Sequence, residues 1–415
     1  IPEKFNKIKL LGEKSIRMEK KITRIYPDKN LFSHVIGQID DDNNGISGIE
    51  KSFDMKLKNS KNKLVLTLDK NLQYIIRNEL LKANKIFKTV GGAGILMNIN
   101  NGEILSLVSV PDFNVNNRED ITDINYINRA TKGVYELGSV FKSFTIAAGL
   151  NYGLISKKDM FLNLEKKMRC GGRIISEYDE NLSKDLSVED ILIYSSNIGS
   201  VKIGQKVGQE KLKKFLKKIG ILGQLNFDIE EIGKPLAFKW RDCKLKTVSY
   251  GHGITTTPIQ LAKGYAIITN GGYDVKPTLI KKEINNLKKK RILDKNISSQ
   301  LNPILRKVVQ NGTASLSDVE GYDVGGKTGT AQIVENGNYT KKKINTFASI
   351  FPSSNPKYVL IVLLEDTKLS KNYVYKYRNK TGTYTGTPFN TAGWTSVEIA
   401  GKIIDKIGPI LATKY

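Results

Sequence analysis

The chain has 415 residues, more than one typical hydrophobic core holds, which predicts one large domain and a smaller one. Hydrophobic residues make up 40% and charged residues 26%, a composition typical of a globular protein that argues against an intrinsically disordered chain. The formal net charge is +25, but the lysines are scattered and no zinc-finger spacing or aromatic platform accompanies them. We therefore expect no nucleic-acid partner, and at most a secondary attraction to anionic surfaces.

The cysteines and the apolar runs limit the remaining classes. Cys170 and Cys243 are the only two cysteines, so the chain has neither a disulfide framework nor a metal-ligand spacing. One bridge and two buried free thiols both remain open. The longest apolar run, 358–364, is too short to span a bilayer and predicts a central strand. Because the chain begins at Ile1 without methionine, we expect a truncated sequence whose missing part holds a membrane anchor.

A change in the sequence pattern near residue 60 predicts a domain boundary. Residues 1–60 are mixed and polar, with turn signals at 26–28 and 40–48, which predicts a small non-catalytic domain. Residues 61–415 form the second domain, beginning with a strand at 63–69.

The rest of the chain contains both strand-like and helix-like patterns of apolar residues. Two apolar runs, 94–98 and 103–110, flank an Asn-Gly turn and predict a β-hairpin. Thr257 and Pro258 are expected at N-cap and N1 of a helix. Helices are predicted at 71–87, 187–206, 209–219, 258–269 and 394–407, and strands at 323–334, 345–352 and 357–365. Strands at both ends with helices between them predict an α+β fold whose sheet is completed by distant segments.

The stretch 133–150, GVYELGSVFKSFTIAAGL, predicts a buried helix beginning near Ser139, with Gly138 as the hinge into it. Residues three apart share a helix face, so Ser139 Oγ and Lys142 Nζ are expected within hydrogen-bonding reach. A serine needs a neighbouring base, and a buried lysine can supply one. By itself the S-x-x-K pattern is more typical of an N-cap serine followed by a solvated lysine.

Two further short motifs follow. Ser195, Ser196 and Asn197 form an S-x-N pattern 56 residues after Ser139, which alone is typical of a helix cap. Lys327, Thr328 and Gly329 form a K-T-G pattern 188 residues after Ser139, which alone predicts an edge strand whose glycine avoids a clash. His252, between two glycines, is interpreted as a structural hydrogen-bonding residue.

In this order, S-x-x-K, S-x-N and K-T-G are the motif set of penicillin-binding proteins and class A β-lactamases. The segments around them, NRAT, GVYELGSVFK, SSNIGS, SYGHGITTTPIQLAKGYAIITNGG and GGKTGTAQ, resemble class B penicillin-binding proteins. The resemblance runs from about Arg24 to Trp394 and so covers nearly the whole chain. It implies the penicillin-binding transpeptidase fold, an antiparallel sheet flanked by helices, with residues 1–60 as part of an N-terminal pedestal domain.

The resemblance also implies residue roles in a peptidoglycan D,D-transpeptidase. Ser139 would accept the acyl group, Lys142 would be its base, and Ser195 would relay the proton to the leaving amine. Asn197 would hold the donor peptide and contact Lys142, while Lys327 would help to keep Lys142 neutral. The remaining site residues are Thr328, Gly329 and Thr330 for substrate binding, with the backbone N–H groups of Ser139 and Thr330 as the oxyanion hole.

The implied partners are stem peptides ending in D-Ala-D-Ala and β-lactams, without a metal or an organic cofactor. The SYGHG segment and the ending TAGWTSVEIAGKII are similar to the septal, division-specific type of Gram-negative bacteria. That type implies a SEDS-type glycan polymerase as partner, with the catalytic domain on the periplasmic side of the inner membrane. A D,D-carboxypeptidase, a β-lactamase or a β-lactam sensor remains the alternative, because these proteins share the three motifs.

Overall fold

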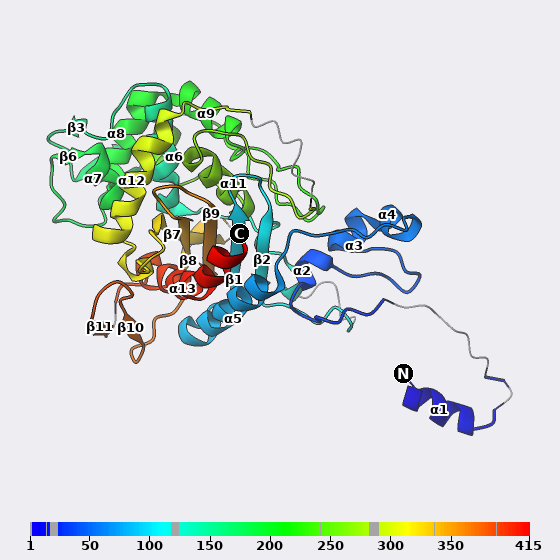
Figure 1. Cartoon of the computed structure of the whole chain (residues 1–415). Coiled ribbons are helices and arrows are strands. Elements are labelled where there is room, and N and C mark those ends of the chain that lie inside the picture. The colour runs from blue at the N-terminus through cyan, green and yellow to red at the C-terminus, as the bar shows by residue number, and fades with distance from the viewer. Residues whose placement is uncertain are drawn as a thin grey trace.

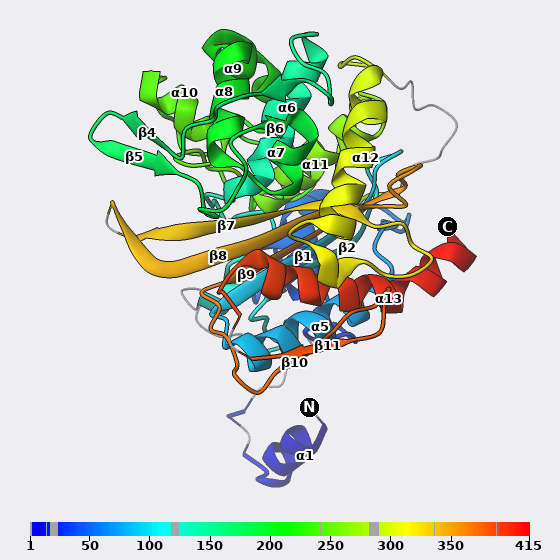
Figure 2. The same ribbon diagram turned by 90° about the vertical axis from the view of Figure 1, so that its left-hand side faces the viewer.

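A five-stranded antiparallel sheet lies between two layers of helices in the computed structural model (Figures 1 and 2). The structure describes residues 2–13, 15–16, 24–117, 124–240, 242–281, 290–335, 337–386 and 388–415. The strand order is β2 (Ile104–Val110), β1 (Gly91–Asn98), β9 (Tyr358–Glu365), β8 (Asn338–Phe351) and β7 (Gly325–Glu335). The predicted α+β class with an antiparallel sheet flanked by helices is confirmed.

The sheet joins early and late parts of the chain, as predicted. The hairpin of β1 and β2 turns at Gly102, whose φ of 80° lies in the left-handed region that glycine adopts without strain. The run 358–364 is buried throughout and forms the central strand β9, because helices cover both faces of the sheet. Strand β8 begins seven residues before its predicted start, since residues 338–343 are polar and extend the β7–β8 hairpin past the core.

Helices cover the two faces unequally. On one face α5 (Lys70–Phe87) packs beside α13 (Ser396–Lys414), and on the other α11 (Pro258–Thr269) supports a larger helical layer (Figure 2). That layer also contains α6 (Lys142–Asn151), α7 (Val188–Ile193), α8 (Asn197–Val207), α9 (Gln209–Lys218) and α12 (Asn296–Asn311). Helix α11 begins with Pro258 at N1 and a capping box between Thr257 and Gln260, which confirms the predicted N-terminus.

Three predicted elements differ from the structure. The segment 63–69 forms only an isolated bridge between Leu66 and Ile280 in the described chain, not a strand of the sheet. The single helix predicted at 187–206 is interrupted between α7 and α8, because Ser195 adopts a left-handed backbone with φ 61°. The helix predicted from Ser139 opens with a 3₁₀ turn, η2 (Gly138–Phe141), so its α-helical part starts at Lys142. Helices α10 (Asp242–Ser249) and α12 were not predicted.

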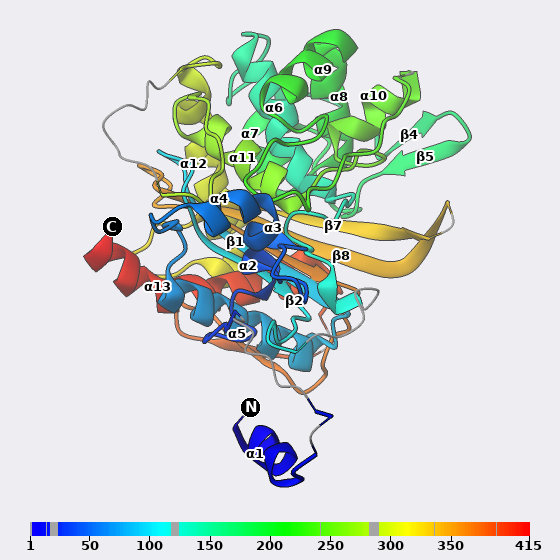
Figure 3. The same ribbon diagram turned by 90° about the vertical axis from the view of Figure 1, so that its right-hand side faces the viewer.

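The N-terminal segment lies against one end of the sheet. Its short helices α2 (Ser33–Ile36), α3 (Gly48–Ser52) and α4 (Asp54–Asn59) lie near β2, and α1 (Pro2–Leu10) lies apart from them (Figures 1 and 3). Val35 and Ile49 belong to the same hydrophobic core as the sheet. The predicted boundary near residue 60 therefore separates parts that pack together, and the pedestal remains a prediction. None of the helices described is long and apolar enough to cross a membrane.

A small hairpin lies outside the main sheet. Strands β4 (Lys167–Cys170) and β5 (Arg173–Ser176) pair with each other, and a disulfide joins Cys170 to Cys243 on α10, with 5.1 Å between the two Cα atoms. This bridge settles the alternative left open by the sequence. The other short pairs are β3 (Met160–Phe161) with β6 (Leu186–Ser187) and β10 (Val374–Lys376) with β11 (Thr383–Thr385).

Candidate active site

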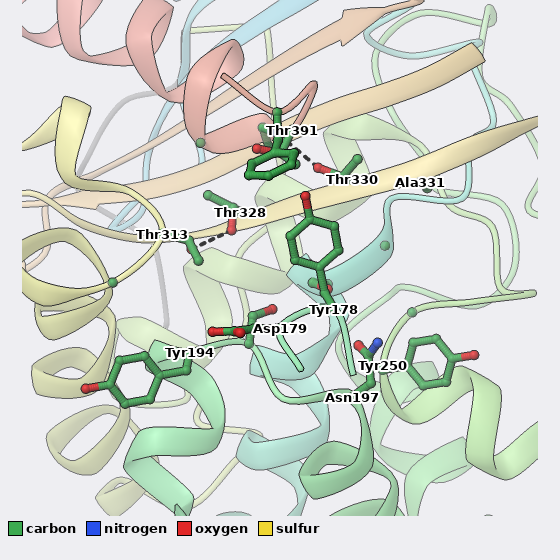
Figure 4. Close-up of a pocket in the computed structure, with 18 of the residues that line it drawn as sticks. Tyr178, Asp179, Tyr194, Asn197, Tyr250, Thr313, Thr328, Thr330, Ala331 and Thr391 are labelled. Carbon is green, nitrogen blue, oxygen red and sulfur yellow. Dashed lines mark hydrogen bonds between the residues drawn. The ribbon is translucent and has the colours of Figure 1, made fainter. Parts of the chain in front are cut away.

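The three sequence motifs converge on one cavity of about 530 Å³ between edge strand β7 and the helical layer. Figure 4 shows Thr328 and Thr330 on the strand side of this cavity and Asn197 on the helical side. Ser139 and Ser195 also line it, whereas Lys142 and Lys327 are fully buried. The structure thus brings together residues up to 188 positions apart in the sequence.

Two glycines allow the turn that carries Ser139 to lie against β7. A Cβ atom at Gly329 would stand 2.1 Å from the carbonyl oxygen of Leu137, and one at Gly138 would stand 2.7 Å from that of Thr330. Gly138 also has φ 61°, which disfavours any other residue. The prediction that Gly329 avoids a clash on an edge strand is confirmed, and the clash it avoids is with the nucleophile's own turn.

Lys142 connects the first motif to the second. Its Nζ donates to the carbonyl oxygen of Ser195, to Ser195 Oγ at 3.0 Å and to Asn197 Oδ1 at 2.7 Å. These three acceptors match the three N–H bonds of an ammonium group. Within the described residues Ser139 Oγ makes no hydrogen bond, so the predicted bond from Ser139 to Lys142 is absent in this state. To act on Ser139, a neutral Lys142 would keep two of these bonds and turn its lone pair toward the serine.

Ser195 lies between the two lysines. Its Oγ accepts from Lys142 and from Lys327 Nζ, the latter at 2.9 Å. The left-handed backbone of Ser195 is uncommon for a residue with a side chain, and strain of this kind gathers at functional sites. It allows both the carbonyl and the hydroxyl of Ser195 to meet Lys142, an arrangement that the Tyr-Ser-Ser-Asn sequence does not indicate.

The third motif is held by neighbouring hydroxyl groups. Lys327 Nζ also donates to the carbonyl oxygen of Thr328 at 3.1 Å. Thr328 Oγ1 shares a 2.7 Å hydrogen bond with Thr313 Oγ1, and Thr330 Oγ1 accepts from the backbone N–H of Ala392 at 2.9 Å (Figure 4). Since Thr330 Oγ1 accepts this bond, its own proton remains available to a ligand carboxylate.

Burial governs the protonation of both lysines. Burial lowers the pKa of Lys142 to about 7, and the nearby charge of Glu177 opposes that shift. Burial also lowers the pKa of Lys327 well below its usual value, and the charge of Lys142 lowers it further. Desolvation is therefore the main cause of a neutral Lys142, and an additional effect of Lys327 on Lys142 stays a prediction.

Some cavity residues were not predicted from the sequence. Glu177, Thr313 and Ala392 contact the three motifs from other segments, and no local pattern singles them out. His252 also lines the cavity. Its Nδ1 lies 3.6 Å from Glu136 Oε2, and its ring stacks on Tyr339 with 4.8 Å between centroids. These contacts fit the interpretation of His252 as a structural residue.

The fold and the convergence of the three motifs are those expected of a serine acyltransferase, and comparison with known proteins agrees. The model of the penicillin-binding protein transpeptidase domain matches residues 92–384. The chain belongs to this family. A probable peptidoglycan D,D-transpeptidase FtsI of Caulobacter vibrioides is 29% identical over 431 residues, covering 100% of this chain and 70% of that protein.

Further relatives narrow the class. The peptidoglycan D,D-transpeptidase FtsI of Buchnera aphidicola is 32% identical, covering 90% of this chain and 70% of that protein. The crystal structure of penicillin-binding protein 3 from Mycobacterium tuberculosis in complex with aztreonam superposes with a TM-score of 0.79 at 25% identity, covering 93% and 90% of the two chains. Within the family, the chain is a class B penicillin-binding protein of the septal FtsI type.

Proposed function

We propose that this chain is a peptidoglycan D,D-transpeptidase that cross-links stem peptides through an acyl-enzyme on Ser139 during septal wall synthesis. One observation carries the proposal. A buried lysine whose pKa is lowered to about 7 lies one turn after Ser139 and shares the hydroxyl of Ser195 with a second buried lysine. This arrangement supplies a nucleophile, a base that can be neutral near pH 7, and a hydroxyl placed to relay a proton.

The first half-reaction forms the acyl-enzyme. Ser139 Oγ attacks the carbonyl carbon between the two D-Ala residues while its proton passes to neutral Lys142. Backbone N–H groups of Ser139 and Thr330 stabilise the oxyanion, and donors of this kind are worth roughly 10²–10³-fold in rate each. The C–N bond then breaks, and the departing D-Ala amine takes up a proton relayed from Lys142 by Ser195 Oγ.

The second half-reaction forms the cross-link. An amine from a neighbouring stem peptide attacks the ester carbonyl and loses its proton by the same route. The C–O bond to Ser139 breaks, and Ser139 regains its proton. If water replaced the amine, the product would be a free acid, as in the hydrolase alternative.

The polar groups around the cavity support the substrate orientation. The hydroxyls of Thr328 and Thr330, with Lys327 behind them, would bind the terminal carboxylate of the donor, and Gly329 would leave room for its backbone. Asn197 uses its Oδ1 for Lys142 and donates from Nδ2 to the carbonyl oxygen of Ser176 at 2.8 Å. One N–H of the Asn197 amide is therefore left for the donor peptide.

The cellular setting is also part of the proposal. Disulfides persist in oxidising compartments such as the bacterial periplasm, so the Cys170–Cys243 bridge supports a catalytic domain on that side of the inner membrane. Anchoring by an N-terminal segment and contact of residues 1–60 with a SEDS-type glycan polymerase follow from the family resemblance.

The test is turnover of a donor peptide ending in D-Ala-D-Ala with a stem-peptide amine as acceptor. We expect a cross-linked dimer by mass spectrometry and, after incubation with a fluorescent penicillin, an adduct that maps to the peptide containing Ser139. Free acid as the only product would establish a hydrolase. A stable penicillin adduct with neither product would establish a sensor.

A further inference from the structure

Glu177 has no role in the mechanism above, yet its carboxylate is hydrogen-bonded to the segment that contains Ser196 and Asn197 of the S-x-N motif. The residue directly follows β5, and both of its carboxylate oxygens face the start of α8. One oxygen accepts from Ser196 Oγ at 2.6 Å and from the backbone N–H of Ile198 at 2.9 Å. The other accepts from the backbone N–H of Asn197 at 2.7 Å.

These bonds make Glu177 a cap supplied by another segment. The first N–H groups of a helix have no partner within it, and an anion near them also interacts favourably with the helix dipole. Helix α8 already has a cap from its own chain, since Ser196 Oγ accepts from the N–H of Gly199. Glu177 satisfies the two preceding N–H groups, at Asn197 and Ile198, and accepts the proton of Ser196 Oγ.

The same segment also holds the side chain of Asn197. The carbonyl oxygen of Ser176 accepts from Asn197 Nδ2, so residues 176 and 177 bind both the backbone and the amide of Asn197. The remaining amide oxygen of Asn197 accepts from Lys142. A single residue, Asn197, therefore separates the carboxylate of Glu177 from the proposed base.

The charge of Glu177 acts on that base directly. Among the described residues, two titratable groups face Lys142, namely Lys327 from β7 and Glu177 directly after β5, while Asp179 lines the same cavity. The negative charge of Glu177 favours the ammonium form of Lys142 and so opposes the effect of burial. Without it, Lys142 would lose its proton at a lower pH.

The hairpin that carries Glu177 is anchored at its other end. The disulfide at Cys170 ties β4 to Cys243 on α10, and α10 leads into residues 250–252 of the cavity wall. One face of this hairpin is buried, with Met168 9% and Ile175 4% exposed, whereas Ile174 on the other face is 65% exposed. The disulfide and the bonds of Glu177 hold the hairpin against two walls of the same cavity.

We propose that Glu177 is a positioning residue of the reaction, which holds the segment of Ser196 and Asn197 against Lys142 and places a negative charge near this base. The proposal rests on the transpeptidase function argued above. Glu177 acts through Asn197 and Lys142 and makes no bond to the reacting atoms.

Two variants separate the charge from the geometry. Glu177→Gln keeps the shape but removes the charge and turns an N–H donor toward one of the helix amides. Glu177→Asp keeps the charge but is one methylene too short to reach all three donors. Glu180→Gln is the matched control, because Glu180 is exposed on the same loop and makes no described hydrogen bond.

The measurement is the second-order rate of acylation by a fluorescent penicillin between pH 5 and pH 9, with circular dichroism to confirm folding. For Glu177→Gln we expect the pH of half-maximal rate to fall by about half a unit, with a plateau about tenfold lower. For Glu177→Asp we expect a similar loss of plateau with the midpoint close to that of the wild type. Glu180→Gln is expected to match the wild type in both.

Several results would overturn the proposal. A wild-type midpoint in folded Glu177→Gln would show that its charge does not reach Lys142, and an unchanged plateau in Glu177→Asp would show that the hydrogen bonds do not position the site. In donor-peptide turnover, a higher KM with unchanged kcat would make Glu177 a substrate ligand instead. If the wild type itself is not acylated, the proposed function fails together with this role, whereas a normal wild type with unaffected variants refutes the role alone.

Discussion

Lys142 and Lys327 are both fully buried beside Ser195, but the regions around them are built differently. Lys142 begins a helix and meets a backbone carbonyl and an amide oxygen, with the carboxylate of Glu177 nearby. Lys327 lies in an edge strand, and within the described part of the chain its Nζ bonds only to hydroxyl and backbone oxygens of Ser195 and Thr328. The same side chain is therefore placed in two electrostatic environments a few ångströms apart.

The two environments suit the two lysines to different tasks. Burial and Glu177 act in opposite directions on Lys142, which leaves its pKa near neutrality, where a group can both take and return a proton. No carboxylate among the described residues acts on Lys327 in this way, so burial and the charge of Lys142 both disfavour its ammonium form. A substrate carboxylate bound at Thr328 and Thr330 would supply the missing anion, and we expect Lys327 to become charged when substrate binds.

The largest expected effect is at the proposed nucleophile, Ser139. Ser139→Ala removes the side chain that we propose accepts the acyl group, so we expect no covalent penicillin adduct by intact mass. Circular dichroism serves as the folding control. A persistent adduct would mean that another side chain is acylated and that the comparison of the lysines concerns the wrong site.

Lys142→Ala is the next strongest test. It removes the proposed base, and general-base catalysis contributes roughly 10²–10⁴-fold, so we expect the acylation rate of the folded variant to fall by that factor. The second-order rate with penicillin measures it. A rate within a few-fold of the wild type would transfer the role of base to Lys327 or to another group.

The pH dependence of acylation by the wild type tests whether Lys142 is the base. The proposed base acts in its neutral form, so a pKa of about 7 for Lys142 predicts a rate that rises through pH 7 and levels off above it. At pH 5 we expect a rate about 100-fold below the plateau, since the neutral fraction falls about tenfold for each pH unit below the pKa. A flat profile between pH 5 and pH 8 would contradict Lys142 as the titrating base.

Lys327→Arg is expected to have a smaller effect. Arginine keeps a positive charge for the substrate carboxylate but changes its shape and cannot lose its proton, so we expect acylation to fall about tenfold without disappearing. The measurement is the same second-order rate, determined in parallel with Lys142→Ala. If both variants lose activity equally, the two lysines act as one unit and the contrast between their regions does not hold.

The smallest effect on rate is expected at the disulfide. Replacing both cysteines, Cys170→Ser and Cys243→Ser, releases a bridge between residues 73 positions apart. We expect a loss of stability of about 2–4 kcal/mol by denaturant unfolding and an acylation rate within a few-fold of the wild type. A loss as large as that of Lys142→Ala would show that the β4–β5 hairpin cannot hold Glu177 without the bridge.

Local sequence patterns predicted most of the site residues and several of the helices and strands. The order S-x-x-K, S-x-N, K-T-G predicted Ser139, Ser195, Asn197 and Lys327 as neighbours, and all three motifs meet at one cavity. The Asn-Gly hairpin, the central strand β9 and the N-terminus of α11 were also predicted, because turn residues, apolar period and helix caps act within a few residues of each other.

Three other features could be seen only in the tertiary structure. The helix predicted at 187–206 is interrupted at Ser195, a disulfide links Cys170 to Cys243, and Glu177 lies against the start of α8. Each of these features depends on contacts between segments that are distant in the sequence or on a backbone conformation that those contacts stabilise. A single glutamate in a polar stretch carries no period and no motif, so its place beside Lys142 follows only from the packing of β5, α8 and α6.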